Sequence, residues 1–328
     1  MTASERVRQI LEIKARHYPI PVDQFSFRPL IAQWQSGRVE CADYFPIRIV
    51  TLLEVFTRSW IAALVDHGSP FIENAIGLSK KLNVKLDFDL LRHLEGQAIS
   101  FGDLISHTVS INRFEQIVGV LSEISGRPLL DAIRDAVDRW AVEIEGKAED
   151  PIIPDKDAMC HALARLFEVR HILCHEVPRS PVYENSEIDG FLRHGLEFVH
   201  ATAETLHSVL YGKSPLTQGA MTQRAFDKLK AAELAMEEVL VKVRERWASD
   251  PTRSELLEKS QSRWREYREL QSRIAGDTTR GGSMSPMSEA YEASEMTQRR
   301  TKVLGEYLTS TLYDPIPPFP PMPSPCPR

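Results

Sequence analysis

One stretch of the sequence, from Pro46 to Gly68, places apolar residues at the three- and four-residue steps of an α-helix until the glycine stops it. The proline suits the first helical turn, because the N–H that it lacks has no partner there. We expect this segment to be the main core helix of the chain. Its apolar positions are Ile47, Val50, Leu53, Phe56, Trp60, Ile61 and Leu64.

The remaining sequence favours helices as well. No alternating apolar and polar pattern of useful strand length occurs, so the expected fold class is all-α. Turn residues and capping patterns delimit the other segments. We expect a helix of about ten residues after Ser4, an irregular proline-containing segment over residues 19–44, a helix from Pro70 to Lys81, a helical region over 89–125 broken near Gly102, a helix from Pro128 to Ile144, a loop from Glu143 to Asp157, a helix from Asp155 to Pro178, and a helix from a Ser186–Asp189 capping box to Gly212.

The length of 328 residues exceeds the usual size of one domain, so two domains are expected. A change of composition after Gly212 indicates where they separate. The predicted parts are an N-terminal helix and irregular segment (1–44), a helical domain (45–212), a linker (213–220), a small three-helix antiparallel domain (221–313) and a disordered proline-rich tail (314–328).

Charge and cysteine content narrow the function classes. Residues 1–213 carry 23 Lys and Arg against 30 Asp and Glu, which argues against a broad basic surface for gripping nucleic acid. Four cysteines without paired spacing predict free thiols. Because neither a long apolar run nor a signal-peptide pattern is present, we expect a cytoplasmic protein with no membrane partner.

The stretch from Glu168 to Glu176 places an arginine on the apolar face of the helix that Asp155 begins. Buried guanidinium groups need a partner, because they do not deprotonate. His171 and His175 lie one turn apart near the end of this helix, which Pro178 stops. The simplest interpretation of Arg170 is a core-edge arginine paired with an acid.

The string Arg170-His-Ile-Leu-Cys-His175 also resembles the Arg-x4–6-His signature of the HEPN superfamily, whose all-helical domains include many metal-independent ribonucleases. The resemblance covers roughly residues 40 to 212. It implies an endoribonuclease that needs no cofactor or metal. Arg170 would bind the phosphate, His175 would transfer protons, and His171 would orient the substrate or His175.

The same resemblance implies partners. A single histidine cannot begin the reaction as both base and acid, so a homodimer formed through the motif helix is expected. Ribosomal, transfer and messenger RNA are equally compatible substrates. A toxin or defence effector controlled by an antitoxin or other regulatory protein is also compatible with this sequence.

Two other interpretations of the region remain open. One interpretation is a metal site, because five residues near one helix have side chains that can bind metal ions: Cys160, His161, His171, Cys174 and His175. The first two lie about three turns from the rest. Alternatively, the domain is a non-catalytic HEPN module that binds a nucleotide or a protein.

The C-terminal segment resembles LprI-type lysozyme inhibitors of the bacterial envelope. The resemblance rests on Trp264, Tyr267-Arg268-Glu269, Gly281-Gly282-Ser283 with Pro286, Met296-Thr297, Arg300 and Leu304. Arg224, Ser272 and Glu292 occupy positions where that family usually carries disulfide cysteines. This departure fits a reducing interior, and we expect the segment to be a scaffold for recognition rather than a lysozyme inhibitor.

Overall fold

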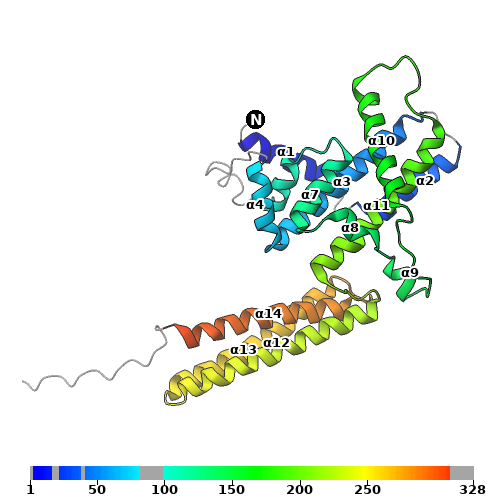
Figure 1. Ribbon diagram of the computed structural model, residues 1–328. Helices are drawn as coiled ribbons and strands as arrows, with labels where there is room; N and C mark the ends of the chain where they lie inside the picture. The colour runs from blue at the N-terminus through cyan, green and yellow to red at the C-terminus, as the bar shows by residue number, and fades with distance from the viewer. Residues whose placement is uncertain (1–2, 17–21, 38–40, 82–98, 311–328) are drawn as a thin grey trace, which may run out of the picture. The chain divides into compact units, whose positions relative to one another are not determined.

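The computed structural model describes residues 3–16, 22–37, 41–81 and 99–310 (Figure 1). Within these ranges the protein is all-α, as predicted, and its one β-type pairing is an isolated bridge between Val137 and Pro151. The chain divides into two compact units, residues 1–213 and 214–328. No helix in the described ranges combines the length and the apolar character needed to cross a membrane.

The first unit is built from short and medium helices around a few long ones. Its elements are α1 (Ala3–Arg16), η1 (Gln24–Phe27), α2 (Arg28–Gln35), α3 (Tyr44–His67), α4 (Phe71–Lys81), α6 (Phe101–Thr108), α7 (Phe114–Ser125), α8 (Leu129–Arg134), α9 (Arg139–Glu143), α10 (Lys156–His175) and α11 (Asn185–Tyr211).

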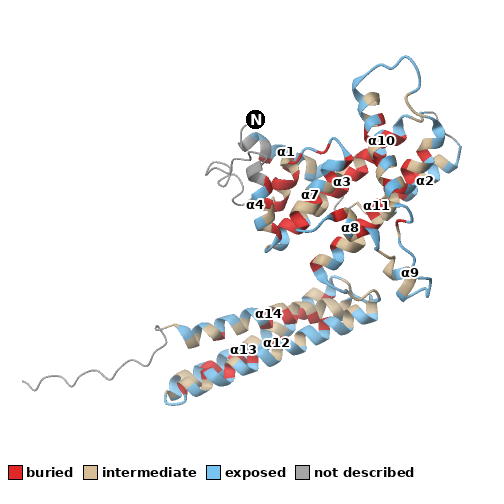
Figure 2. Cartoon of the chain, in the orientation of Figure 1, coloured by how far each residue is buried: buried red, intermediate tan, exposed pale blue. Residues whose placement is uncertain are grey.

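Helix α3 is the centre of this unit and packs against α4, α6, α7, α10 and α11. Its predicted core positions are buried, with two exceptions (Figure 2). Trp60 is half-buried, and Ile47 is 36% exposed. Ile47 lies on the same side of α3 as Glu54 and Arg58. These residues follow it by seven and eleven positions, and both steps differ from whole helical turns by only about 20°. That stripe is the polar side of the helix.

The segment 19–44 is more regular than the sequence suggests. Residues 17–21 and 38–40 lie outside the described residues, but η1 and α2 occupy most of the remainder. Asp23 and Ser26 form a capping box, and Pro29 lies in the first turn of α2, where a missing N–H costs nothing. Phe27 and Leu30 are buried as a result. The prediction of an irregular segment is therefore wrong for residues 24–35.

The break predicted near Gly102 lies at residues 99–100, which are not helical, and Gly102 itself lies in the first turn of α6. An added Cβ there would approach the backbone oxygen of Ala62 to 2.4 Å, and the Gly102 N–H donates to Asp66 Oδ1 at 2.8 Å. The glycine thus permits α6 to approach α3 closely. A further interruption, which was not predicted, lies between Thr108 and Phe114, and residues 89–98 are outside the described residues.

Two further boundaries differ from the prediction. The single helix expected from Pro128 to Ile144 is two short helices, α8 and α9, because the side chain of Asp138 caps a new start by accepting from the Ala141 N–H at 3.0 Å. Helix α11 begins two residues early, with Glu184 rather than Ser186 as the cap. The loop before α10 and the end at Gly212 are confirmed.

The described residues of the second unit form three helices that lie side by side (Figure 1). Helix α14 packs along both of the others. The proline-rich tail (314–328) is outside the described residues. The helices are α12 (Gln218–Trp247), α13 (Pro251–Asp277) and α14 (Ser285–Thr309), and their apolar core contains Met236, Leu240, Val243, Trp247, Leu257 and Leu304.

The contact at Gly102 gives a paired test of stability. Gly102→Ala should destabilise the protein by about 1–3 kcal/mol, because the new methyl meets backbone that cannot rotate away. Gly119→Ala in α7 meets nothing within 4 Å and should stabilise by up to about 1 kcal/mol through helix propensity. Urea unfolding measures both. Equal effects of the two substitutions would contradict the close helix contact.

The connection between the units gives a second test. Trypsin should cleave after Lys213, the one basic residue between the end of α11 and the start of α12, and its side chain is 76% exposed. Lys213→Gln should abolish this cut while leaving other sites unchanged. Mass spectrometry of the products identifies it. A surviving fragment that spans residues 205–225 after the rest is digested would argue against separate units.

Candidate functional site

Helix α10 is fixed at its start and along its apolar face. The side chain of Asp155 accepts a hydrogen bond from the Ala158 N–H at 2.9 Å, which caps the helix as predicted. Met159, Leu163 and Leu166 are fully buried, and α10 packs against α3, α7 and α11. The last turn of α10 is the part that remains accessible.

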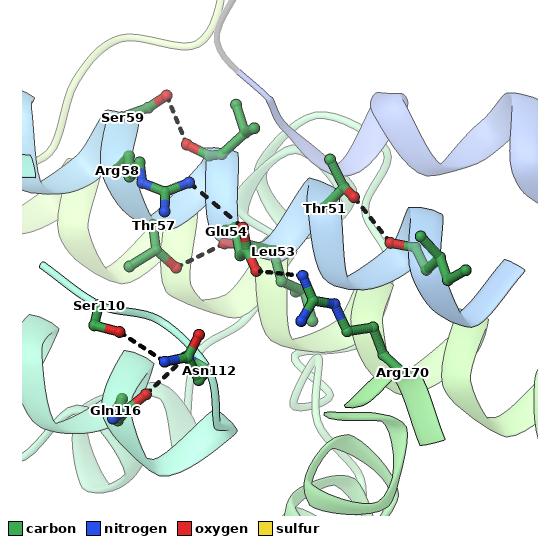
Figure 3. A network of polar contacts seen from close by, with 12 residues as sticks. Thr51, Leu53, Glu54, Thr57, Arg58, Ser59, Ser110, Asn112, Gln116 and Arg170 are labelled. Carbon is green, nitrogen blue, oxygen red and sulfur yellow. Dashed lines mark hydrogen bonds and ion pairs between the residues drawn. The ribbon is translucent and has the colours of Figure 1, made fainter. Parts of the chain in front are cut away.

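Arg170 is half-buried on the side of α10 that faces α3. Its Nη2 lies 3.8 Å from Glu54 Oε1, so the acidic partner that the sequence requires is on α3 (Figure 3). Glu54 Oε2 lies 3.5 Å from Arg58 Nη1. One carboxylate therefore serves two guanidinium groups, and this cluster keeps a net charge of +1.

The hydroxyl groups near this cluster are engaged elsewhere. Thr51 and Thr57 donate to the carbonyls of Ile47 and Leu53 on their own helix, at 2.9 and 2.7 Å (Figure 3). They do not compete with the two arginines for Glu54. The excess positive charge is consequently available to an anion that approaches from solvent.

His171 and His175 are both exposed at the end of α10. Their ring centroids are 4.9 Å apart with a tilt of 45°, so the structure brings these two predicted site residues together. It does not bring Arg170 to His175 in the same way. Five helical residues correspond to about 140° of rotation, so the two side chains leave α10 in different directions.

The loop that follows α10 is attached to the helix by Arg165. Its guanidinium forms ion pairs with Glu168 (2.9 Å) and Glu187 (3.3 Å) and donates to the backbone carbonyl of Val182. Next to the histidines, Val177 is 97% exposed. An anchored loop thus carries an uncovered apolar side chain beside the candidate site.

The alternative metal site at this helix is not assembled. Within the described residues, no three of Cys160, His161, His171, Cys174 and His175 place ligand atoms within 4.8 Å of one another. Cys41, Cys160 and Cys174 are free thiols.

Four residues whose side chains could take part in binding or catalysis were not predicted from the sequence. Glu54 pairs with Arg170 across 116 positions of sequence, and no local pattern signals such a contact. A second group, Asp138, His200 and Glu204, brings three ligand atoms to within 4.8 Å of one another. The spacing of His200 and Glu204, four residues apart on one helix, was the available signal.

In the second unit, the residues of the predicted family resemblance form a polar seam between the helices. Arg268 forms an ion pair with Glu233 (2.8 Å), donates to Thr297 Oγ1 (3.0 Å) and lies over the ring of Trp264. Arg268 thereby connects all three helices of this unit.

A second arginine extends the seam. Arg300 donates to Gln261 Oε1 at 3.1 Å and to Ser260 Oγ at 2.8 Å, and Gln261 is 1% exposed. Ser272, which stands where the family usually has a cysteine, is buried, whereas Arg224 is exposed. Hydrogen bonds and packing, rather than disulfides, hold the described helices of this unit together.

Comparisons with known proteins agree with this part of the chain. Residues 213–304 match the family model described as lysozyme inhibitor LprI, so the C-terminal unit is LprI-like. An uncharacterized protein of Rhizobium meliloti (strain 1021) is 43% identical over 56 residues, which is 17% of this chain and 40% of that protein. The chain therefore spans less than half the length of this relative. No solved structure matches.

The ion pair between Glu54 and Arg170 can be measured with a double-mutant cycle. Glu54→Gln, Arg170→Met and the double variant should show a coupling of about 0.5–1 kcal/mol in urea unfolding, since both groups keep some solvent contact. The same cycle on Arg134 and Asp135, which are 57% and 77% exposed, should give a coupling near zero. Equal couplings for the two pairs would show that Glu54 does not hold Arg170.

Proposed function

We propose that the first unit is a metal-independent endoribonuclease of the HEPN type. The observation that supports it is the chemistry at the end of α10. The Arg170 guanidinium shares the carboxylate of Glu54 with Arg58, and the ring centroids of two exposed imidazoles lie 4.9 Å apart near the same helix end. Arginine, histidine and a positive local charge are what phosphodiester cleavage in RNA requires.

The reaction uses the nucleophile that RNA carries. A neutral imidazole takes the proton from the 2'-hydroxyl, whose oxygen attacks the adjacent phosphorus. The bond from phosphorus to the 5'-oxygen breaks, and that oxygen receives a proton from an imidazolium. The products are a 2',3'-cyclic phosphate and a 5'-hydroxyl. In this scheme Arg170 binds the non-bridging oxygens, His175 transfers protons, and His171 orients the substrate or His175.

The scheme requires two copies of the chain. Base and acid must be in opposite protonation states at the start, which a single histidine cannot satisfy. A two-fold dimer places the same patch of each subunit against the other, so His175 and the partner subunit's His175 supply the pair. The uncovered Val177 beside the helix end gives such an interface an apolar contact.

A second candidate function has an observation in its favour. Because Glu54 already neutralises part of the Arg170 charge, the arginine also fits a structural role that joins α10 to α3. The first unit would then be a non-catalytic HEPN module that binds a nucleotide or a protein. The two candidates differ in what happens when histidine is removed.

The LprI-like unit fits a role in recognition under this proposal. Its described helices are held without disulfides, and the described cysteines of the first unit are free thiols, which suits a cytoplasmic protein. The unit would select the RNA or bind an antitoxin or other regulatory protein. Its Lys and Arg residues are balanced by Asp and Glu, so net charge alone does not favour broad phosphate binding by this unit.

Histidine and arginine variants test the proposal on total RNA with EDTA present. His175→Ala should lower the cleavage rate by about 10²–10⁴, because it removes the general acid-base group. Arg170→Ala should lower it comparably, and Arg170→Lys should keep most of the defect because the planar fork is lost. His171→Ala should have a smaller effect. End mapping should find 2',3'-cyclic phosphates.

His161→Ala is the matched control, since His161 is exposed on the same helix, away from its end. It should cleave like the wild type, and circular dichroism should show all variants folded. If His175→Ala is folded and cleaves at the wild-type rate in EDTA, the ribonuclease proposal is wrong and the non-catalytic module replaces it.

A further inference from the structure

A cluster of side chains that commonly bind metal ions lies on α11 and at the start of α9. It is separate from the residues proposed for RNA cleavage. His200 and Glu204 are four residues apart on α11 and therefore lie on one face of it. Asp138, the N-cap of α9, faces them. One ligand atom from each of the three side chains lies within 4.8 Å of the others.

His200 has a ring nitrogen without a hydrogen-bond partner. Its Nε2 is buried, and the nearest carboxylate oxygen, Asp138 Oδ2, is 3.8 Å away, which is too far for a hydrogen bond. A ring nitrogen without a hydrogen-bond partner keeps the lone pair or proton site through which histidine binds a metal ion.

The two carboxylates leave negative charge facing this nitrogen. Asp138 uses Oδ1 to cap α9, which leaves Oδ2 directed at His200. Glu204 brings a second carboxylate oxygen to within 4.8 Å of the ligand atoms of Asp138 and His200, so the two like charges repel each other. A cation placed among the three groups would relieve that repulsion.

Two of the nearby basic side chains form ion pairs with other acids. Arg139 Nε lies 2.9 Å from Glu143 Oε1, which also pairs with Lys213, and Lys147 Nζ lies 2.7 Å from Glu145 Oε2. Arg28 also lines the pocket, and Lys147 interacts with Asp138 at longer range, so the negative charge of the cluster is partly offset. An ordinary buried histidine–acid contact would show a hydrogen bond between ring and carboxylate, and none is formed here by Nε2.

A pocket of about 600 Å³ adjoins the cluster and has Asp138, His200 and Glu204 in its wall, together with Trp140 and Lys147. Three protein ligands around a cation leave coordination positions open, and the pocket has room for water or a small ligand at them. Tetrahedral coordination at about 2.1 Å would bring the ligand atoms to about 3.4 Å from one another.

We propose that Asp138, His200 and Glu204 bind one divalent transition-metal ion, with Zn²⁺ and Mn²⁺ as the matching ions. One imidazole nitrogen and two carboxylate oxygens suit these cations. Ca²⁺ and Mg²⁺ prefer oxygen ligands and, for Mg²⁺, retained water, so they should bind far more weakly. This site is independent of the proposed ribonuclease chemistry, which needs no metal.

The test is a titration of the full chain with MnCl₂, in which electron paramagnetic resonance measures free Mn²⁺. Mn²⁺ is used because exposed thiols such as Cys174 bind it poorly. The wild type should bind one ion per chain, and ZnCl₂ should displace it. Asp138→Asn and His200→Ala should each weaken binding at least tenfold. Asparagine still caps α9, so the first variant should keep the fold.

His207→Ala is the matched control, because His207 is exposed on the same helix two turns beyond His200. It should bind Mn²⁺ like the wild type, and Mn²⁺ should raise the melting temperature of both proteins but not that of Asp138→Asn. Wild-type binding that is absent at millimolar Mn²⁺, or that survives in both Asp138→Asn and His200→Ala, would overturn the proposal. Because no RNA is present, loss of the ribonuclease proposal would leave this result unaffected.

Discussion

The burial of helix α3 is the constraint on which the rest of the first unit depends. Its buried positions include the adjacent pairs Ile49–Val50 and Leu52–Leu53, so apolar side chains cover much more than one stripe of the helix. The side of α3 that carries Glu54 and Arg58 is half-buried or exposed. Five helices pack around α3, and α10 meets it at that polar stripe. The position of the candidate site thus follows from the one side of α3 that is not apolar.

The sequence predicted the features whose causes are local. Asp155 caps α10 and glycines end α3, α7 and α11 because these residues act on their own or neighbouring peptide groups. The close packing at Gly102 depends on a distant element instead, because only the approach of α3 makes a glycine necessary in α6. The irregular segment expected around Pro29 is a helix, because a proline in a first turn is compatible with the start of a helix.

The same distinction applies to the site. An arginine on an apolar stripe predicts an acidic partner, and this requirement follows from the pattern of one helix alone. It could not identify Glu54, since the partner is set by how α3 and α10 pack. The cluster of Asp138, His200 and Glu204 was not predicted. Asp138 lies in the break between α8 and α9, where a continuous helix was expected. In the LprI-like unit, two residues that carry the family resemblance, Arg268 and Arg300, both lie in the polar seam. Each contacts groups that helical spacing brings to that seam.

The direction of the side chains on α10 decides what kind of catalyst the proposed ribonuclease can be. Arg170 points toward α3 and Glu54, whereas His175 lies about 140° further around the helix and is exposed. In one copy of α10 the two side chains therefore leave the helix in different directions, which makes joint contact with one phosphate harder to achieve. A second copy across a two-fold axis removes this difficulty, because the partner subunit's His175 can approach Arg170 from outside. Under this proposal, dimerisation completes the site as well as supplying the second histidine, and a regulatory protein that covers the end of α10 would prevent both.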